Sequence, residues 1–340
     1  RLHEQGTWTM PELDLSTTYL GLALRNPLIV GSGPLTDSVA GVKQCAEAGA
    51  GAVVLKSLFE EEIRADADQM SDTLSEAAAW HSEVYEYLQA DIGMRYGPRK
   101  YLEMVNAAAA AVEIPVIASI NCVSADTWPE FAAEVAAAGA DALELNVAIF
   151  PRDTQETASQ IEQRIVDIAA AASQAVDIPV SVKLADTFTA LPNLVLRLRQ
   201  AGARGCVLFN RLYQPTIHPE TMKVVGGARY STPAESALAI RWLAVLSGCL
   251  NLDFAAATGF HAGTHLARGI LAGANAVQML TVLDRQGIGQ IQTVLSELRS
   301  WMARKEFSCL DDFRGLVSQG HHPEEPLFTR LQYMKRLAGE

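Results

Sequence analysis

Side chains able to bind a ligand recur at one place in the sequence, directly after short apolar runs. Lys56 and Lys183 each follow such a run, and Asn121, Asn146 and Asn210 follow three others. An ammonium group at the end of a buried strand loses its hydration, which is costly unless an anion or a set of acceptors meets it. An asparagine amide both donates and accepts, which suits a heterocycle whose edge alternates carbonyl and NH groups. These residues therefore predict an electron-rich ligand with an amide-like edge.

A phosphorylated flavin meets both requirements. Its pyrimidine ring carries such an edge, and its reduced form gathers negative charge that a nearby lysine would stabilise. For the phosphate, Thr258-Gly259 and Thr281 follow later apolar runs, and Gly227 lies in the preceding loop. Barrel enzymes often surround phosphate with backbone NH groups at this point of the chain.

Other interpretations remain open for the same residues. A structural ion pair with an acidic neighbour would explain either lysine alone, and any one asparagine could form a turn. Lys56 or Lys183 could also serve as the Schiff-base nucleophile of a lyase or aldolase. His261 and His265 are four residues apart but have no third ligand beside them, so we predict no metal site.

An internal repeat indicates the elements that position these side chains. Four segments share a small-residue turn of the Ala-Gly-Ala type followed by an apolar run, and they begin at Ala48, Ala138, Ala201 and Ala272. A glycine there suits the left-handed end of a helix, and the apolar run suits a buried parallel strand. Three further runs open with proline, and a fourth, at 252–256, lacks it. We therefore predict eight strands, starting near residues 28, 52, 116, 142, 180, 206, 252 and 276.

Strands that alternate with helices predict a parallel sheet, and eight such units predict a (β/α)8 TIM barrel. Two connections are too long for a simple helix, 57–114 after the second strand and 211–232 after the sixth. Both follow the carboxyl ends of strands, the face on which barrels of this kind build an active site. We expect one barrel domain over residues 10–340, and an extension at 1–9, ahead of Met10, that is not part of the native fold.

The composition excludes several classes of protein. The chain has 340 residues, 49% of them hydrophobic, and a net charge of −12 from 27 basic and 39 acidic side chains. Disorder and nucleic-acid partners are therefore not expected. Five cysteines, none in a C-x-x-C pair, predict neither a disulfide framework nor a metal cluster, and favour a cytoplasmic setting. No run reaches the roughly 20 apolar residues that span a bilayer, so we expect no membrane association.

The strand ends resemble those of the dihydroorotate dehydrogenases, which are FMN-dependent (β/α)8 barrels. The matching stretches are Asn26-Pro27-Leu28 with Ser32-Gly33, Val53-Val54-Leu55-Lys56-Ser57, Ser119-Ile120-Asn121, Ala142-Leu143-Glu144-Leu145-Asn146, Val182-Lys183-Leu184, Asn210 and 272–278. The resemblance implies that FMN is bound by Ser32, Gly33, Ser57, Asn121, Lys183, Gly227, Gly259 and Thr281, with Thr258, Asn146 and Lys56 also in contact. It further implies that Lys56 lies between flavin and substrate, and that Asn146 and Asn210 bind the substrate.

In that family a hydride leaves carbon 6 of dihydroorotate for the flavin, while a base on a loop removes the carbon-5 proton. We therefore expect an FMN-dependent oxidoreductase acting on a CH–CH bond, with dihydroorotate as the first candidate substrate. Lys56, Asn146 and Asn210 are the expected catalytic residues. We also expect a soluble electron acceptor, and the resemblance leaves a homodimer or a redox partner subunit, such as an iron-sulfur protein, open.

The chain departs from the family where the base should be. The family has a cysteine or serine there, whereas this segment reads Ile149-Phe150 ahead of Pro151, and neither side chain takes a proton. Asp153 or Thr154 could replace the base. Thr258 and Leu280 stand where glycines usually approach the phosphate. The alternative is therefore a flavin-binding subunit that works in a larger redox complex or on another substrate.

Overall fold

The computed structural model describes residues 13–59, 98–122, 128–147, 149, 151–212 and 214–321. Its parallel strands run in the order β4-β3-β13-β12-β9-β8-β7-β6, and β4 also pairs with β6, so the sheet closes on itself. The strands are β3 (Leu28–Val30), β4 (Ala52–Val54), β6 (Val116–Cys122), β7 (Ala142–Val147), β8 (Val180–Leu184), β9 (Gly205–Leu208), β12 (Asp253–Ala256) and β13 (Ala276–Met279). Each starts at, or one residue from, its predicted position. The predicted (β/α)8 barrel is confirmed.

The strands form at the short, mostly apolar runs of the sequence, and both of their faces are buried. Every residue of β7 and β8 is buried, as expected for a parallel sheet covered by helices outside and filled by side chains inside. The glycines of the four repeats have φ of +103° at Gly49, +101° at Gly139, +105° at Gly202 and +107° at Gly273. Only glycine adopts this left-handed conformation readily, so each repeat ends a helix one turn before the next strand.

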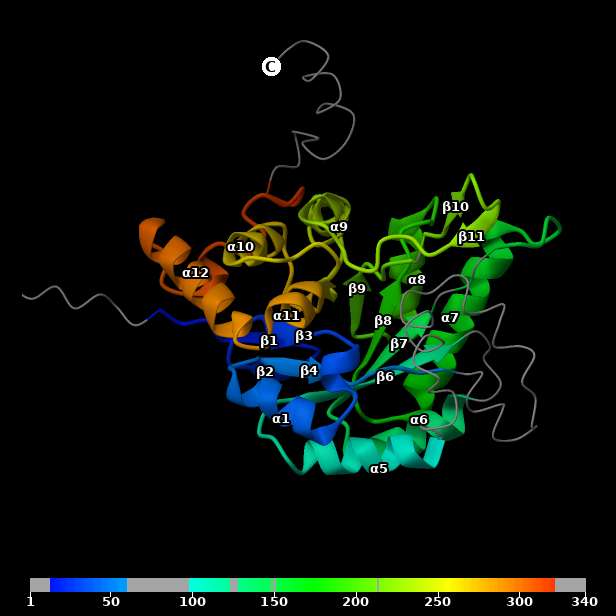
Figure 1. Ribbon diagram of the computed structural model, residues 1–340, viewed down its shortest axis with the longest axis horizontal. Helices are drawn as coiled ribbons and strands as arrows, with labels where there is room; N and C mark the ends of the chain where they lie inside the picture. The colour runs from blue at the N-terminus through cyan, green and yellow to red at the C-terminus, as the bar shows by residue number, and fades with distance from the viewer. Residues whose placement is uncertain are drawn as a thin grey trace, which may run out of the picture.

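Helices cover the outside of the barrel, with α1 and α5 on one side of the strands and α9, α10 and α12 on another (Figure 1). The helices are α1 (Val39–Glu47), α5 (Pro98–Ala109), α6 (Trp128–Ala137), α7 (Ala158–Ala175), α8 (Leu191–Gln200), α9 (Ser236–Leu246), α10 (Gly263–Leu271), α11 (Thr281–Gln286) and α12 (Gln290–Arg304). On α8, Leu191, Leu194, Val195 and Leu198 are buried, a helical spacing that turns one face to the strands.

A hairpin of β1 (Thr17–Tyr19) and β2 (Leu22–Leu24) closes the amino end of the barrel. Tyr19, Leu20 and Leu24 form one buried cluster with inward-facing strand residues such as Ile29 and Ala255. The backbone NH of Leu20 donates to Asp253 Oδ2 at 2.6 Å, which fixes the hairpin to the start of β12. Because this end is closed, a ligand can enter the barrel at the carboxyl ends of the strands.

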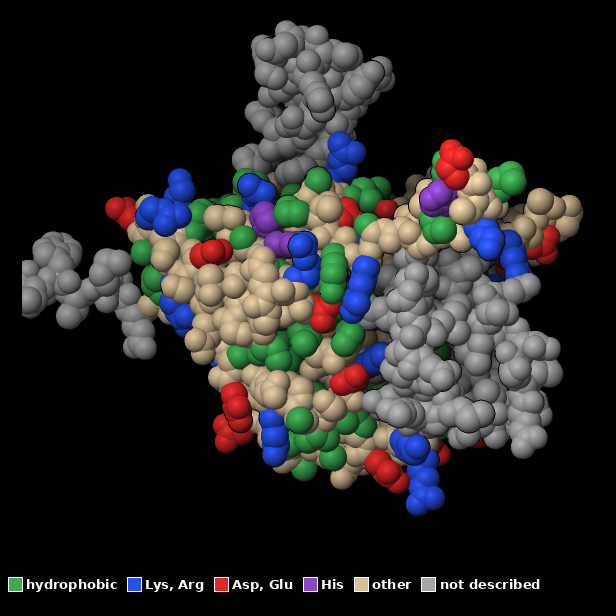
Figure 2. Space-filling view, in the orientation of Figure 1, with side chains coloured by type: hydrophobic (Ala, Val, Ile, Leu, Met, Phe, Trp, Pro, Cys, Tyr) green, Lys and Arg blue, Asp and Glu red, His purple; other side chains and the backbone are tan. Residues whose placement is uncertain are grey.

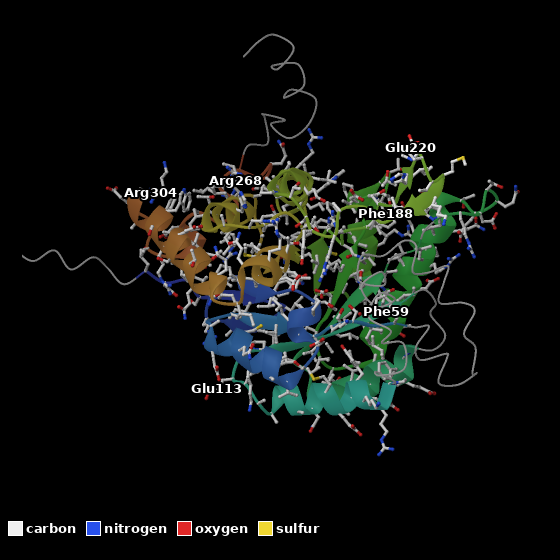
Figure 3. All side chains as sticks on the ribbon, in the orientation of Figure 1. Phe59, Glu113, Phe188, Glu220, Arg268 and Arg304 are labelled. Atoms are coloured by element: carbon white, nitrogen blue, oxygen red, sulfur yellow. The ribbon has the colours of Figure 1, made fainter. Side chains whose placement is uncertain are left out.

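The two long connections differ in how much of them is described. After β4 the chain forms β5 (Leu58–Phe59), which pairs with the end of β6, and the rest of this connection up to α5 lies outside the described residues. After β9 the chain forms an antiparallel hairpin of β10 (Thr216–His218) and β11 (Lys223–Val225), and then η2 (Pro233–Glu235) leads into α9. Figure 3 labels Glu220 at the tip of the hairpin, where Figure 2 shows hydrophobic side chains at the surface.

The ends of the chain fall outside this description. The extension predicted at 1–9 belongs to the undescribed residues 1–12, and the residues after 321 are likewise undescribed. The last described element is η3 (Leu310–Asp312). In the described ranges, no helix is long and apolar enough to cross a membrane.

Candidate active site at the carboxyl ends of the strands

Three of the predicted site residues form a row at the mouth of the barrel. Asn121 on β6 is in register with Asn146 on β7, and Asn146 is in register with Lys183 on β8. Adjacent positions in register point to the same side of a sheet, so the three side chains lie next to one another. The side chain of Asn210, which follows β9, donates from Nδ2 to Asn146 Oδ1 at 3.0 Å.

Two amides of this row have hydrogen-bonding capacity to spare. The Nδ2 atoms of Asn121 and Asn146 are buried and have no hydrogen-bond partner. An unpaired buried donor costs about 1–3 kcal/mol, so proteins rarely keep one without a use. Two such donors beside a lysine fit the carbonyl and ring-nitrogen acceptors of a flavin or of a pyrimidine-like substrate.

Lys183 is in contact with a buried acid and a buried amide in the interior of the barrel. Its Nζ donates to Gln278 Oε1 at 3.1 Å and lies 3.5 Å from Glu144 Oε1. Only 1% of Glu144 is exposed to solvent. The structural ion pair considered from the sequence therefore exists for Lys183. Lys183 and Gln278 also line the cleft at the mouth of the barrel, called the main cleft below, and the ligand role of Lys183 stays a prediction.

The main cleft has an empty volume of about 820 Å³, including the part open to solvent. Seven predicted residues line it, namely Ser32, Gly33, Lys183, Asn210, Thr258, Gly259 and Thr281. They come from five different strand ends that are far apart in the sequence. The barrel therefore brings these residues, which were predicted at the ends of separate strands, together at one opening.

The β12 and β13 ends of the cleft are shaped by backbone conformation. Gly259 has φ +83°, and a Cβ there would come within 2.4 Å of Ser236 N. Thr258 also has a positive φ, +69°, and its Oγ1 donates to the Phe209 carbonyl at 3.0 Å. Backbone in this conformation can approach a ligand closely, as a phosphate cradle requires.

Leu280 takes up part of the space that a glycine would leave open. A Cβ on Gly33 would lie 2.6 Å from Leu280 Cδ2, so the leucine side chain packs directly over that glycine. Next to it, Thr281 Oγ1 accepts from Ser231 N at 3.3 Å and from Ser231 Oγ at 3.0 Å. The part of the cleft predicted to hold the phosphate is therefore partly filled by Leu280, and the hydroxyl groups of Ser231 and Thr281 line it.

Ser57 belongs to a chain of buried hydroxyl groups. Ser57 N donates to Ser32 Oγ at 2.9 Å, and Ser57 Oγ lies 2.8 Å from Ser119 Oγ. These contacts connect the first three barrel strands at their carboxyl ends. Ser32 lines the main cleft, whereas Ser57 lines the smaller pocket that also includes Lys56.

Five predicted residues are not among those that line the main cleft, namely Lys56, Ser57, Asn121, Asn146 and Gly227. Lys56 lines a smaller pocket with Asp37 and Tyr101. At Gly227 a Cβ would come within 1.9 Å of the Gln214 carbonyl oxygen, so this glycine serves the close approach of two loop segments. For Lys56 the predicted contact with flavin and substrate remains a prediction.

The two candidate bases are both exposed. Asp153 Oδ1 accepts from the Gln155 NH at 2.9 Å, and Thr154 is its exposed neighbour. Phe150 and the residue before Ile149 lie outside the described residues, so the segment in which the family carries its base is only partly described. The role of Asp153 or Thr154 remains a prediction.

A cluster of charged groups that was not predicted from the sequence lies on the outer wall of the cleft. Arg229 Nη2 lies 3.5 Å from Asp284 Oδ2, and Tyr230 donates to the same oxygen at 2.8 Å. Arg211 Nε lies 2.9 Å from Glu235 Oε1. The signal was present, since Arg211 follows Asn210 directly and the Arg229-Tyr230 pair ends a loop predicted to face the site.

The two histidines take part in the support of this wall. His261 Nε2 lies 3.1 Å from Ser231 Oγ, and the His261 NH donates to His265 Nδ1 at 3.0 Å. Burial lowers the pKa of both histidines, which favours the neutral form. Among the described residues no group of three or more His, Cys, Asp or Glu side chains could hold a metal ion.

Comparison with known proteins assigns the family. The sequence model for dihydroorotate dehydrogenase matches residues 14–302, most of the chain. The chain belongs to the dihydroorotate dehydrogenase family. The resemblance seen at the strand ends is therefore confirmed, and the chain is an oxidoreductase of the class that acts on CH–CH bonds with a flavin.

Several relatives match the chain over almost its whole length. The catalytic subunit of dihydroorotate dehydrogenase B (NAD+) from Methanocella arvoryzae is 29% identical over 305 residues, which cover 87% of this chain and 95% of the relative. The corresponding subunit from Methanothermobacter thermautotrophicus is 25% identical, with 89% and 98% covered. A chloroplastic dihydropyrimidine dehydrogenase (NADP+) from Arabidopsis thaliana is 24% identical, with 89% and 77% covered.

Proposed function

We propose that this member of the dihydroorotate dehydrogenase family binds FMN and oxidises a CH–CH bond of a dihydropyrimidine, with dihydroorotate as the first substrate, in pyrimidine biosynthesis. The observation that carries the proposal is the row of Asn121, Asn146 and Lys183. It combines two unpaired buried amide donors with an ammonium group at the mouth of the barrel. A flavin and a cyclic amide are ligands whose acceptors match that row.

The residues present fit FMN. Lys183 would face the flavin ring from the floor of the cleft, Asn121 and Asn146 would donate to its polar edge, and Gly259 and Thr281 would hold the phosphate. The cofactor would supply the hydride acceptor, a chemistry that protein side chains lack. Asn210, already bonded to Asn146, would align the amide edge of the substrate, and we keep Lys56 as the residue between flavin and substrate.

A Schiff-base lyase is disfavoured by the environment of Lys183. A Schiff base requires a neutral amine with a free lone pair. Here the carboxylate of Glu144 and the carbonyl oxygen of Gln278 both stabilise the ammonium form. The same contacts suit a lysine whose task is to present positive charge to a flavin.

For the proton that leaves carbon 5, we propose Asp153 as the acceptor. Of the two candidates it carries the carboxylate, and general-base catalysis requires a group that can hold the proton. Asp153 follows the end of β7, the strand that carries Asn146.

The electrons would pass to a soluble acceptor through a partner subunit. The support comes from relatives that are named as catalytic subunits of an NAD+-linked enzyme. We place the protein in the cytoplasm, and the free thiols of Cys45, Cys206, Cys249 and Cys309 support a reducing compartment.

Anaerobic reduction of the purified flavoprotein tests this function. The protein would be mixed with dihydroorotate in one cuvette and with dihydrouracil, which lacks the carboxylate, in another, and flavin absorbance would be followed. We expect bleaching with dihydroorotate. Bleaching with dihydrouracil alone would move the substrate to the uncharged dihydropyrimidines, and bleaching with neither would exclude dihydropyrimidines as substrates of this chain.

A further inference from the structure

The interior of the barrel contains a buried carboxylate that the proposed reaction does not use. Glu144 lies on β7 two residues before Asn146, and it is 1% exposed. Burying a carboxylate costs several kcal/mol unless a cation and hydrogen bonds compensate it. A buried carboxylate in the middle of a strand needs a specific explanation.

The contacts of Glu144 lead directly to the floor of the cleft. Its Oε1 lies 3.5 Å from Lys183 Nζ, and its Oε2 accepts a hydrogen bond from Gln278 Nε2. The other end of the Gln278 amide accepts from Lys183 at 3.1 Å, so the three side chains form a closed triangle from β7, β8 and β13. Gln278 can satisfy both neighbours only in this orientation of its amide.

The triangle fixes both the position and the effective charge of Lys183. Glu144 Oε1 has no hydrogen-bond partner, so its negative charge acts on Lys183 through space. The same charge contributes to raising the pKa of the Tyr19 phenol well above its usual value, after the larger effect of burial. Glu144 is therefore a source of negative potential that low surrounding polarity leaves unscreened.

We propose that Glu144 is a positioning residue that sets the reduction potential of the bound flavin, by compensating part of the positive charge that Lys183 presents to the cleft. This inference rests on the proposed function, since it needs a flavin in the cleft. Reduction adds negative charge to the flavin, and an uncompensated lysine would favour the reduced form. Glu144 opposes that effect, so the cofactor stays oxidised more readily and can pass its electrons on.

Three variants of the holoprotein separate this role from a structural one. Glu144→Gln keeps the side chain's size but removes the charge, so the equilibrium constant for reduction should rise about tenfold, equivalent to about 30 mV for a two-electron couple. Gln278→Glu adds a carboxylate beside Lys183 and should shift the constant in the opposite direction. Glu162→Gln is the matched control, because Glu162 is a buried acid on α7, paired with Arg197 at 3.4 Å outside the barrel.

The measurement is anaerobic equilibration of each yellow protein with a reference dye of known potential, which needs no substrate turnover. Opposite shifts in Glu144→Gln and Gln278→Glu, with no shift in Glu162→Gln, support the inference. If only one of Glu144→Gln and Gln278→Glu folds, a shift of its reduction potential in the predicted direction supports the inference and a shift in the other direction overturns it. Wild-type potentials in flavin-loaded variants overturn the inference but leave the proposed function intact, whereas failure of the wild type to bind flavin overturns both.

Discussion

Lys183 has two roles, one in stability through its ion pair with Glu144 and one in the proposed binding of the cofactor. Its ammonium is neutralised from inside the barrel by Glu144 and faces the cleft on its other side. Removing one partner of a buried ion pair leaves an uncompensated charge, which is more damaging than removing both. Stability and cofactor binding can therefore be separated at this position.

We predict that Lys183→Ala lowers the free energy of unfolding by about 3 kcal/mol, because it leaves Glu144 buried without its cation. Urea denaturation of the apoprotein measures this. The double variant Lys183→Ala/Glu144→Gln should recover most of the stability but bind FMN at least about tenfold more weakly than the wild type. Equal stability of the single and double variants would show that Lys183 does not compensate the buried charge of Glu144.

Asp153 allows a test of the missing base. We predict that Asp153→Asn lowers the turnover number about 100-fold or more, as loss of a general base does, while the visible spectrum of the bound flavin stays unchanged. Thr154→Val is the neighbouring control and should retain activity. Unchanged turnover in Asp153→Asn, measured under the same conditions, would remove Asp153 from the mechanism.

Residue types at the strand ends were predictable, but their partners were not. Lys183, Asn121 and Asn146 stood out because polar side chains directly follow apolar runs. Glu144 carried no such signal, because it lies inside the strand. Its partner in register on β8 is Ser181, and its contact with Lys183 is seen only in the folded structure. Lys56 has the same sequence signal as Lys183, but the pocket that it lines is a smaller one, with Asp37 and Tyr101.

At the scale of elements, the turns after β12 and β13 shape the cleft. The sequence pattern predicted that the glycine and threonines of these turns line the site, because a turn needs glycine where φ is positive and these residues directly follow apolar runs. It could not predict that Leu280 packs over Gly33, since that contact joins strand ends about 250 residues apart and depends on barrel closure.

We predict that Gly259→Ala is more destabilising than Gly287→Ala. Both glycines have positive φ, +83° and +92°, so alanine costs roughly 1–2 kcal/mol at either. At Gly287 a Cβ meets nothing within 4 Å, whereas at Gly259 it meets backbone at 2.4 Å, which adds about 1–3 kcal/mol. Thermal unfolding of both variants measures the difference, and FMN affinity should fall only in Gly259→Ala. Equal losses would contradict the cradle assigned to Gly259.

The C-terminal turn η3 depends on pH through Asp312. Its Oδ2 accepts from Ser308 N at 2.6 Å and from Cys309 N at 2.9 Å. These hydrogen bonds lower the pKa of Asp312 from 3.8 to about 2, and the bond from Cys309 has the largest effect. A lowered pKa in the folded state adds stability above pH 3.8 that is lost as the pH falls through about 2. We predict that Asp312→Asn lowers the midpoint of thermal unfolding at pH 7 and that the difference from the wild type shrinks below pH 3.8. A pH-independent difference would refute this account of the turn.

At the scale of the whole molecule, closure of the barrel makes the site. The first and last strands, β3 and β13, pair with each other, so Gly33 and Thr281 meet although they lie at opposite ends of the barrel sequence. The four Ala-Gly-Ala turns predicted four of the eight strands, because each marks a helix end followed by a buried strand, and the apolar runs that alternate with them predicted the other four. The course of the long connections was not predictable, since neither carries a repeated pattern.

The visible absorption spectrum of the protein as isolated tests the central claim most directly. We predict a yellow protein that releases close to one FMN per chain on acid extraction, as identified by mass spectrometry, and an apoprotein that recovers the spectrum when FMN is added back. A colourless protein that also fails to take up added FMN would contradict the assignment of Lys183, Asn121 and Asn146 to a flavin site.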